Sequence, residues 1–322
     1  MSTEKDSFMQ NSNNNRERKP NWLKIKLPSG EGYSRVNRVV KEHGLHTICS
    51  SGLCPNIAEC WGNGTATFMI LGDVCTRACR FCATTTGKPV APDSNEPERV
   101  AQSVKLMGLN HCVITSVTRD DLDDGGAKHW QNTIAEVRKQ NPKTKVEVLI
   151  PDFDGNTELI DIVLQANPHI VAHNIETVER LTPSVRSRAK YRLSLSVVGH
   201  IAQKGFIAKS GIMLGLGETK EEVLQAMDDL LAVGCKAITL GQYLQPRTDN
   251  ISVEGYVTPE QFEEYRVIAL QKGFTFAESG PLVRSSYHAE EAIKNGQPTA
   301  QSEKEKNDNI NANSNLPKSW SS

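Results

Sequence analysis

The sequence has no long apolar run and almost no net charge. No stretch approaches the roughly 18 consecutive apolar residues of a membrane-spanning helix, so we expect no membrane association. The 38 acidic and 37 basic side chains leave a formal net charge of −1, whereas a chain that binds nucleic acid along its length usually has a basic excess. The N-terminus also lacks the apolar core of a secretion signal. These absences argue against membrane and nucleic-acid partners, and we expect a cytoplasmic protein.

Hydrophobic residues are scarce at both ends of the chain. Residues 1–18 are rich in asparagine and charged side chains, and residues 293–322 are rich in Asn, Ser, Lys and Gln, with Trp320 as a lone aromatic. Such segments bury too little apolar surface to offset the entropy lost when a chain becomes ordered. We therefore predict a disordered N-terminus (1–18), a disordered tail (293–322) and a folded part between them.

Six of the eight cysteines form two closely spaced trios. Their spacings are C-x4-C-x5-C and C-x3-C-x2-C, at Cys49, Cys54 and Cys60 and at Cys75, Cys79 and Cys82. A cytoplasmic address makes structural disulfides rare, and structural zinc usually has four ligands in C-x2-C pairs. Iron–sulfur clusters are held by cysteine thiolates, and three thiolates on a four-iron cluster leave one iron open. The spacing favours such a cluster over zinc or structural thiols, above all at the second trio.

The two remaining cysteines lie in apolar surroundings. Cys112 is part of the run HCVITS, and Cys235 precedes the strand-like segment KAITL. A free cysteine commonly behaves as a small buried hydrophobic residue. We therefore expect both in the core.

Strand-like and helix-like segments alternate from residue 67 onwards. Apolar runs typical of strands cover 67–71, 111–117, 145–150, 169–173, 206–214, 236–240 and 274–277. Segments with helical periodicity lie between them, at 94–108, 127–140, 156–166, 176–181, 190–204, from 218 and at 259–272. Alternation with right-handed crossovers produces a parallel sheet.

Six such repeats predict an α/β fold, a partial (βα)6 TIM-like barrel over residues 67–277. An N-terminal extension (19–66) would carry the first cysteine trio, and a C-terminal segment would cover 278–292. Polar motifs follow the predicted strands at their carboxyl ends, where such folds place their sites. They are the second trio, TSVTRDDLDDGGA (115–127), HNIET (173–177), GIMLGLGE (211–218) and GQYLQP (241–246).

The C-x3-C-x2-C loop after the first strand is typical of the radical S-adenosylmethionine superfamily, and the chain resembles its lipoyl synthase family. The resemblance runs from about Lys19 to Glu290 and rests on KPNWLKIKLP, CPNIAECW, VCTRACRFC, RDDLDDGGA, HNIETVERLTPSVR, GIMLGLGE, GQYLQP and GPLVRSSYHA. The two trios together with RSSY are specific to that family. Departures are small: Thr118 stands where the family often has Asp, residues 84–86 (TTT) are an unusual sequel to the loop, and the asparagine-rich tail falls outside the pattern.

The resemblance implies two [4Fe–4S] clusters per chain, the first of them at the C-x3-C-x2-C loop. Cys75, Cys79 and Cys82 would hold three of its irons, and the fourth iron would bind S-adenosylmethionine. An electron from the reduced cluster would cleave the sulfonium and produce a 5′-deoxyadenosyl radical. The protein's task would be to position the cofactor and shield the radical.

The second implied cluster is an auxiliary one. Cys49, Cys54 and Cys60 would hold it, with Ser286 of RSSY as its fourth ligand and Ser285 as the less favoured alternative. A hard alkoxide matches soft-metal preferences poorly, so this bond should be easily lost. That property suits the family's auxiliary cluster, which donates its own sulfides to the substrate.

The implied reaction is a sulfurtransferase reaction at C6 and C8 of an octanoyl chain that is amide-linked to a lysine of a lipoyl carrier domain. Each lipoyl group would require two molecules of S-adenosylmethionine. Implied partners are octanoylated lipoyl domains of 2-oxoacid dehydrogenase E2 subunits, the glycine cleavage H protein, reduced ferredoxin or flavodoxin, and an iron–sulfur carrier protein. Residues 16–41 carry eight basic and two acidic side chains, and this arm is either a docking site for acidic lipoyl domains or a solvated basic segment.

The same resemblance implies five contacts with S-adenosylmethionine, at Phe81, Arg119, Asn174, Glu176 and Gly215. Four of these positions have a simpler alternative. Phe81 fits core packing, Arg119 fits a solvated charged loop with its neighbours, and Asn174 fits a helix N-cap. Gly215 also suits an ordinary strand-to-helix turn. The residues alone leave these alternatives open.

Two rival functions remain open from the sequence. One is a biotin-synthase-like sulfurtransferase of the same superfamily, against which the C-x4-C-x5-C trio and RSSY count. The other is a metal-binding scaffold or electron carrier, which would make no 5′-deoxyadenosine. His43, His46 and His288 lie near the cysteines in sequence, but isolated histidines are usually surface or hydrogen-bonded residues, and we expect none as a ligand.

Overall fold

The computed structural model describes residues 19–24, 29–42, 47–51 and 54–288. The predicted disorder at both ends, and His43 and His46, lie outside these residues. In the described part of the chain, no helix combines the length and the apolar character needed to cross a membrane.

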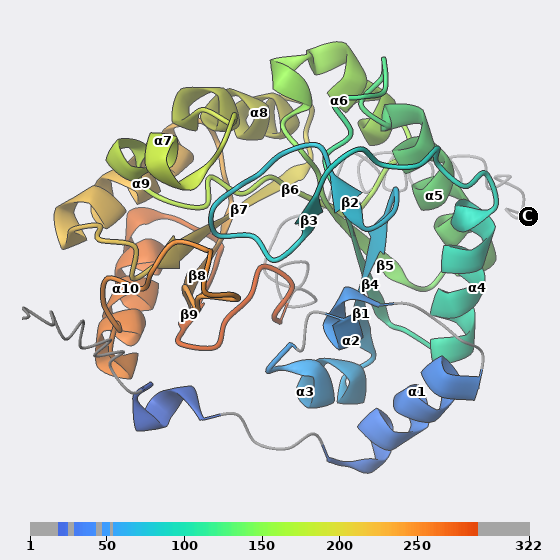
Figure 1. The fold of residues 1–322 in the computed structure, drawn as a ribbon, viewed down its shortest axis with the longest axis horizontal. Coiled ribbons are helices and arrows are strands. Elements are labelled where there is room, and N and C mark those ends of the chain that lie inside the picture. Colours follow the sequence, from blue (N-terminus) through green and yellow to red (C-terminus); the bar gives the residue numbers. More distant parts are fainter. Residues whose placement is uncertain (1–18, 25–28, 43–46, 52–53, 289–322) are drawn as a thin grey trace, which may run out of the picture.

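A parallel sheet of seven strands forms the centre of the molecule. The strands lie side by side in chain order: β1 (Thr65–Ile70), β4 (His111–Ser116), β5 (Lys145–Leu149), β6 (Ile170–Ala172), β7 (Ile207–Leu214), β8 (Ala237–Gln242) and β9 (Phe276–Gly280). Each neighbouring pair is parallel, from Thr65 opposite His111 at one edge to Ala237 opposite Phe276 at the other. The sheet curves into an open barrel (Figure 1).

Helices return the chain between strands and cover the outside of this barrel (Figure 1). They are α4 (Glu96–Met107), α5 (Ala127–Gln140), α6 (Thr157–Leu164), α8 (Tyr191–Gln203), α9 (Lys220–Ala232) and α10 (Pro259–Lys272). Local residues set their ends. Thr219 and Glu222 form a capping box at the start of α9, and α10 ends at Gly273, whose φ of 119° suits glycine.

The strands are buried on both faces because helices cover one side and the barrel interior the other. Side chains in these strands are fully buried, among them Val146, Val148, Ile238 and Leu240. This burial explains why the strands are apolar runs in the sequence. The predicted α/β partial barrel is confirmed, and the helices predicted at 127–140 and 259–272 have those bounds.

One predicted element differs from the structure. The short helix expected at 176–181 is replaced by a shorter 3-10 helix, η3 (Glu179–Leu181). The α-helix α7 (Thr182–Val185) follows it directly. Pro183 lies in the first turn of α7, where a missing N–H is harmless, so a new helix begins there. Another short helix, η2 (Phe153–Gly155), follows β5.

The N-terminal extension lies beside the gap between β1 and β9 (Figure 1). It contains η1 (Asn21–Leu23), α1 (Glu31–Glu42), α2 (Ile48–Ser51) and α3 (Ile57–Gly62). Helices α2 and α3 pack against β1, and the fully buried Trp61 stacks on Tyr33 with a ring separation of 5.6 Å. Val36, Val40, Cys49 and Trp61 of the extension join the main core of the barrel. The division into segments 19–66, 67–277 and 278–292 stays a prediction.

Candidate active site

The loop after β1 carries the second cysteine trio at the carboxyl edge of the sheet. Strand β2 (Val74–Cys75) pairs in parallel with β3 (Thr85–Thr86) and closes the loop at its base. Within it, the Cys82 N–H donates to the Cys79 carbonyl at 3.1 Å. Burial raises the pKa of Cys82, and the nearby charges of Cys79 and Cys75 add to that rise. The three thiols are therefore close enough to interact electrostatically.

Backbone N–H groups point at two of these thiols. The Arg77 and Thr118 N–H groups lie 3.4 and 3.3 Å from Cys75 Sγ, and the Thr84 N–H lies 3.4 Å from Cys82 Sγ. Hydrogen bonds to sulfur favour the thiolate over the thiol and tune the potential of iron–sulfur clusters. Three partly exposed thiols with such donors fit a [4Fe–4S] cluster.

Arg77, inside the cysteine loop, ties that loop to two others. Its guanidinium is 6% exposed and donates to both oxygens of Asp120 at 2.8 Å, to Asp152 at 2.8 Å and to Asp154 at 3.1 Å. Arg188 adds a second cation, 2.8 Å from Asp154. The Arg77 hydrogen bond is the main cause that lowers the pKa of Asp120. Burial raises the pKa of Asp152, but Arg77 outweighs it and the net shift is downward.

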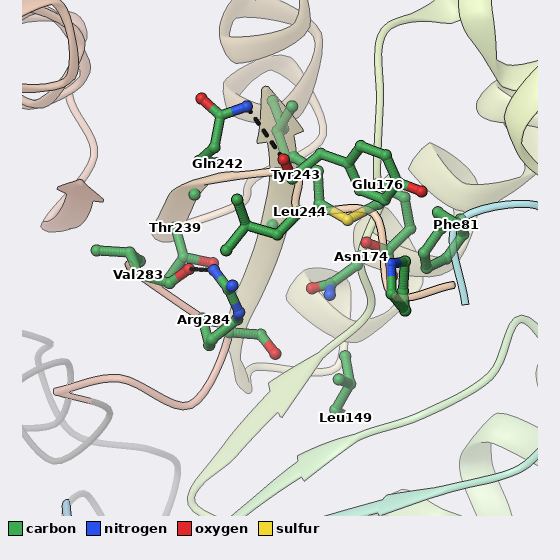
Figure 2. A pocket seen from close by; sticks show the side chains of 16 residues that line it. Phe81, Leu149, Asn174, Glu176, Thr239, Gln242, Tyr243, Leu244, Val283 and Arg284 are labelled. Carbon is green, nitrogen blue, oxygen red and sulfur yellow. Dashed lines mark hydrogen bonds between the residues drawn. The ribbon is translucent and has the colours of Figure 1, made fainter. Parts of the chain in front are cut away.

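A cavity of about 320 Å³ opens beside this loop, which is within the usual size of small-molecule sites (Figure 2). Strand ends and the C-terminal segment form its wall, including Phe81, Leu149, Asn174, Glu176, Met213, Thr239, Gln242, Tyr243, Val283, Arg284 and Ser285. Figure 2 shows Phe81 and Arg284 on opposite sides, with Asn174 between them. Three of the five predicted cofactor contacts thus lie at one cavity.

Asn174 and Glu176 supply polar groups to the cavity wall. Asn174 Oδ1 is buried without a hydrogen-bond partner in the described part of the chain, which leaves an acceptor for a ligand donor. Glu176 has a φ of 66°, and its backbone is held by bonds to Gly211 and Met213 at 3.0 and 2.8 Å. Burial raises the pKa of Glu176, and the charge of Arg186 partly opposes the rise. Strained backbone of this kind persists where the surroundings enforce it, often at ligand sites.

The alternative role of Asn174 as a helix cap is not observed. The next helix, η3, begins at Glu179 and has Val178 at its N-cap position.

Arg119 and Gly215 do not line this cavity. Arg119 is 1% exposed, and its guanidinium donates to both oxygens of Asp121 and to the carbonyls of Leu71 and Val90. These bonds fix the loops after β1 and β4 to each other. At Gly215, an added Cβ would lie 2.1 Å from the Gln242 side chain, so the glycine permits close packing. Both residues therefore have structural contacts within the chain, and their contacts with the cofactor stay predictions.

The first cysteine trio lies on the N-terminal extension. Cys49, on α2, is 7% exposed and accepts the Thr67 N–H of β1 at 3.4 Å. Burial raises the pKa of both Cys49 and Cys54. The charge of Cys54 raises the pKa of Cys49 further, whereas the charge of Arg284 lowers the pKa of Cys54. Cys60 lies on α3. The donor set of three thiols fits a second iron–sulfur cluster.

The RSSY turn folds back onto α3. Tyr287 Oη donates to Glu59 at 3.0 Å from either carboxylate oxygen, and the Asn56 side chain donates to the Leu282 carbonyl at 2.8 Å. Both serines of the turn are partly buried, and Ser285 lines the cavity. The turn is thus brought to the first trio from 228 positions away. Whether Ser286 or Ser285 is the ligand stays a prediction.

The other predicted roles are resolved by burial and contacts. Cys112 and Cys235 are buried as expected, and burial raises the pKa of Cys235 to about 12. His288 bonds to Glu59 and lies 3.5 Å from Glu278, as expected of a hydrogen-bonded histidine. The contacts of Arg77 were missed, because its carboxylate partners come from other loops and no local spacing reveals them.

Comparisons with known proteins agree with this geometry. The family model of the Radical SAM superfamily matches residues 69–230, and that of the N-terminal domain of lipoyl synthase matches residues 2–54. Solved structures show the fold: Streptococcus suis SuiB bound to S-adenosylmethionine has a TM-score of 0.54 at 10% identity, covering 70% of this chain and 53% of that one. Methylornithine synthase has a TM-score of 0.50 at 13% identity, covering 74% and 72%. Fold and cysteine loop together define a radical SAM enzyme.

Curated relatives show which family of radical SAM enzymes the chain is similar to. A lipoyl synthase of Bacteroides thetaiotaomicron is 60% identical over 279 residues, which cover 87% of this chain and 99% of the relative. A lipoyl synthase of Treponema denticola is 56% identical over 277 residues, covering 86% and 96%. The chain belongs to the lipoyl synthase family of the radical SAM superfamily, and the resemblance drawn from its motifs is confirmed.

Proposed function

We propose that this chain inserts two sulfur atoms, at C6 and C8, into an octanoyl group carried on a lysine of a lipoyl domain. The observation that carries the proposal is one cavity bordered by segments that belong to both cysteine sites. Phe81, from the loop of the second trio, borders it on one side, and Arg284 and Ser285, from the turn beside the first trio, border it on the other. A radical source and a sulfur source on either side of one substrate is the arrangement that this reaction needs.

Two clusters and S-adenosylmethionine supply the chemistry when bound: one cluster the electron that cleaves the cofactor, the auxiliary cluster the sulfur. Cys75, Cys79 and Cys82 would hold the first cluster. Cys49, Cys54 and Cys60 would hold the auxiliary cluster, with a serine of RSSY. The donor sets described above support both assignments.

The chain's own side chains would bind and orient the reactants. The unpartnered Asn174 Oδ1 and the Glu176 carboxylate offer acceptors to the amino or ribose groups of the cofactor. Phe81 offers an aromatic face. Buried strand ends around the cavity exclude water, which protects a reactive radical.

The cavity wall also suits an alkyl chain. Leu149, Ile212, Met213, Leu244 and Val283 contribute apolar surface to it, and apolar lining with a few placed polar groups is the usual form of such sites. The carriers would be lipoyl domains of 2-oxoacid dehydrogenase E2 subunits and the glycine cleavage H protein. Reduced ferredoxin or flavodoxin would supply electrons, an iron–sulfur carrier protein would restore the consumed cluster, and the reaction would take place in the cytoplasm.

The test is anaerobic reconstitution followed by assay. We expect about eight irons per chain, as two [4Fe–4S] clusters require, with Mössbauer spectra of four-iron clusters. With dithionite and S-adenosylmethionine, the protein should form 5′-deoxyadenosine and add two sulfurs to an octanoyl-lysine peptide. Dethiobiotin is the control substrate for the biotin-synthase alternative and should remain unchanged. Cofactor cleavage without sulfur transfer to the peptide would overturn the proposal.

A further inference from the structure

The two halves of the proposed auxiliary site come from opposite ends of the folded chain. The cysteines lie on the N-terminal extension, whereas Ser286 lies on the turn after β9. A serine oxygen suits iron in a soft cluster less well than thiolate does. The iron–oxygen bond by itself therefore gives only a weak hold on the turn, and other contacts must keep the two halves together.

Glu59 lies at the centre of those contacts. It immediately precedes Cys60 on α3, and its carboxylate accepts the Tyr287 hydroxyl, with both oxygens at 3.0 Å. His288 Nε2 lies 3.0 Å from the same carboxylate. One carboxylate next to a proposed cysteine ligand thus contacts the two residues that follow the proposed serine ligand.

Further contacts fix the orientation of this group. The Tyr287 and His288 rings are stacked, with centroids 3.9 Å apart and planes 22° from parallel. His288 Nδ1 faces a second carboxylate, that of Glu278 in β9, at 3.5 Å. Asn56, at the N-cap position of α3, holds the Leu282 carbonyl at 2.8 Å. The turn is therefore attached to α3 at both of its ends.

We infer that Glu59 is a positioning residue of the auxiliary site. Together with Tyr287 and His288 it forms a clasp that holds Ser286 against the cysteine-bearing helix, independently of any bond from serine to iron. A group held in this way rebinds as an intramolecular ligand at high effective concentration. The inference rests on the proposed function, because it assumes the auxiliary cluster.

The consequence is a measurable property of the fourth iron. A four-iron cluster that keeps only three thiolates loses one iron on mild oxidation: [4Fe–4S]²⁺ becomes [3Fe–4S]⁺ plus Fe²⁺, and one electron passes to the oxidant. The clasp should slow this loss by keeping the serine oxygen within reach. Glu59 is not among the residues that line the cavity, so its effect should appear at the cluster.

The experiment uses the full chain with Cys75, Cys79 and Cys82 all changed to Ala, so that only the auxiliary cluster assembles. Glu59→Ala, Glu59→Gln and Tyr287→Phe are made in this parent, with Glu98→Ala, an exposed helical glutamate, as the matched control. Each protein is reconstituted anaerobically and treated with one equivalent of ferricyanide. The growth of the three-iron EPR signal and the release of Fe²⁺ are followed with time.

We expect Glu59→Ala to lose the fourth iron about five- to ten-fold faster than the parent, the factor expected when a small group of hydrogen bonds is removed. Tyr287→Phe should show a smaller acceleration. Glu59→Gln should stay near the parent, since its amide oxygen still accepts the tyrosine hydroxyl, and Glu98→Ala should match the parent.

Equal rates for Glu59→Ala and the parent would overturn the clasp while leaving the proposed function intact. Equal acceleration by Glu59→Gln and Glu59→Ala would also overturn it, because the hydrogen bond would then be irrelevant. A parent that assembles no cluster would overturn the proposed auxiliary site, and the clasp with it.

Discussion

The two trios have the same number of cysteines but are held in different ways. The second trio lies on one loop, which is closed at its base by β2 and β3 and tied down by Arg77. The first trio is spread over α2, α3 and the connection between them, and it meets the RSSY turn only because the chain returns after β9. One site is local in sequence, and the other is closed by both ends of the fold.

The difference matches the chemistry proposed for each site. A loop fixed by a buried ion network keeps its geometry through many turnovers, as a radical-generating site requires. A site closed by a hydrogen-bonded turn on the surface can release and recover one ligand, because exposed contacts are individually weak. The loop of the second trio is therefore suited to a fixed geometry, and the site of the first trio is suited to the exchange of one ligand.

Removing one cysteine from each trio should separate the two sites most strongly. Cys79→Ala should abolish both cleavage of S-adenosylmethionine and sulfur insertion. Cys54→Ala should leave cleavage largely intact and abolish insertion, because the radical site does not depend on the first trio. Chromatographic quantification of 5′-deoxyadenosine and of thiolated peptide measures both. Equal loss of cleavage in the two variants would contradict the division of labour.

Arg77→Met should show how far the loop site depends on its ion network. The substitution removes the cation bonded to both Asp120 and Asp152 and leaves Asp120 with Arg188 at 3.7 Å. Breaking a buried charge network typically costs about 3–5 kcal/mol. Urea denaturation of the apoprotein measures the change in the free energy of unfolding. Arg99→Met is the matched control: Arg99 pairs with Asp93 at the exposed surface, and such pairs contribute about 1 kcal/mol or less. Similar values for both variants would show that the network is not a major source of stability.

Substitution of Ser285 and Ser286 should show which serine belongs to the site of the first trio. Ser286→Ala should reduce insertion of sulfur about ten- to a hundredfold, equivalent to roughly 1.4–2.7 kcal/mol of activation free energy, and spare cofactor cleavage. Ser285→Ala should have a smaller effect, since Ser285 lines the cavity. Single-turnover assays of peptide thiolation compare the two variants. A larger effect of Ser285→Ala would make Ser285, in place of Ser286, the proposed cluster ligand.

Acid should weaken the loop site. The pKa values of Asp120 and Asp152 are lowered in the folded protein, so their stabilising contribution is fully present above the unfolded value of about 3.9. It is lost as the pH falls through the folded values. Arg77 and Arg188 face these acids, together with Asp154 and His173. Denaturation of the apoprotein from about pH 5 down to about pH 2 should show the decline, and Arg77→Met should flatten it.

Phe81→Leu should produce the smallest change. The aromatic ring borders the cavity from the loop side, and aromatic contacts are worth about 0.5–1.5 kcal/mol beyond the area they bury. We expect KM for S-adenosylmethionine to rise a few-fold with little change in kcat. An unchanged KM would favour plain core packing for Phe81.

The sequence predicted those features that depend on local pattern. Apolar runs alternating with helical periodicity were sufficient for the barrel, and cysteine spacing was sufficient to mark both trios. The resemblance supplied Asn174 and Glu176, which lie at the cavity. These features depend on residues close together in the chain or on a family motif.

Features that depend on pairing across loops were not predictable. The resemblance placed Arg119 at the cofactor, with a solvated charged loop as the alternative. Neither reading foresaw that its guanidinium bonds to Asp121 and two carbonyls. The contacts of Arg77 and Glu59 join segments far apart in sequence. A charged side chain at a strand end looks the same in sequence whether it faces a ligand or a neighbouring loop.

The late return of the RSSY turn also constrains the order of biosynthesis. The loop of the second trio follows the first barrel strand, whereas Tyr287, which contacts Glu59, follows the last barrel strand, β9. During translation the nascent chain can present three thiols of the extension long before the turn leaves the ribosome. The site of the first trio is therefore complete only once the whole barrel has been synthesised. A protein truncated before the turn would lack Ser285 and Ser286, and this site would have no serine to close it.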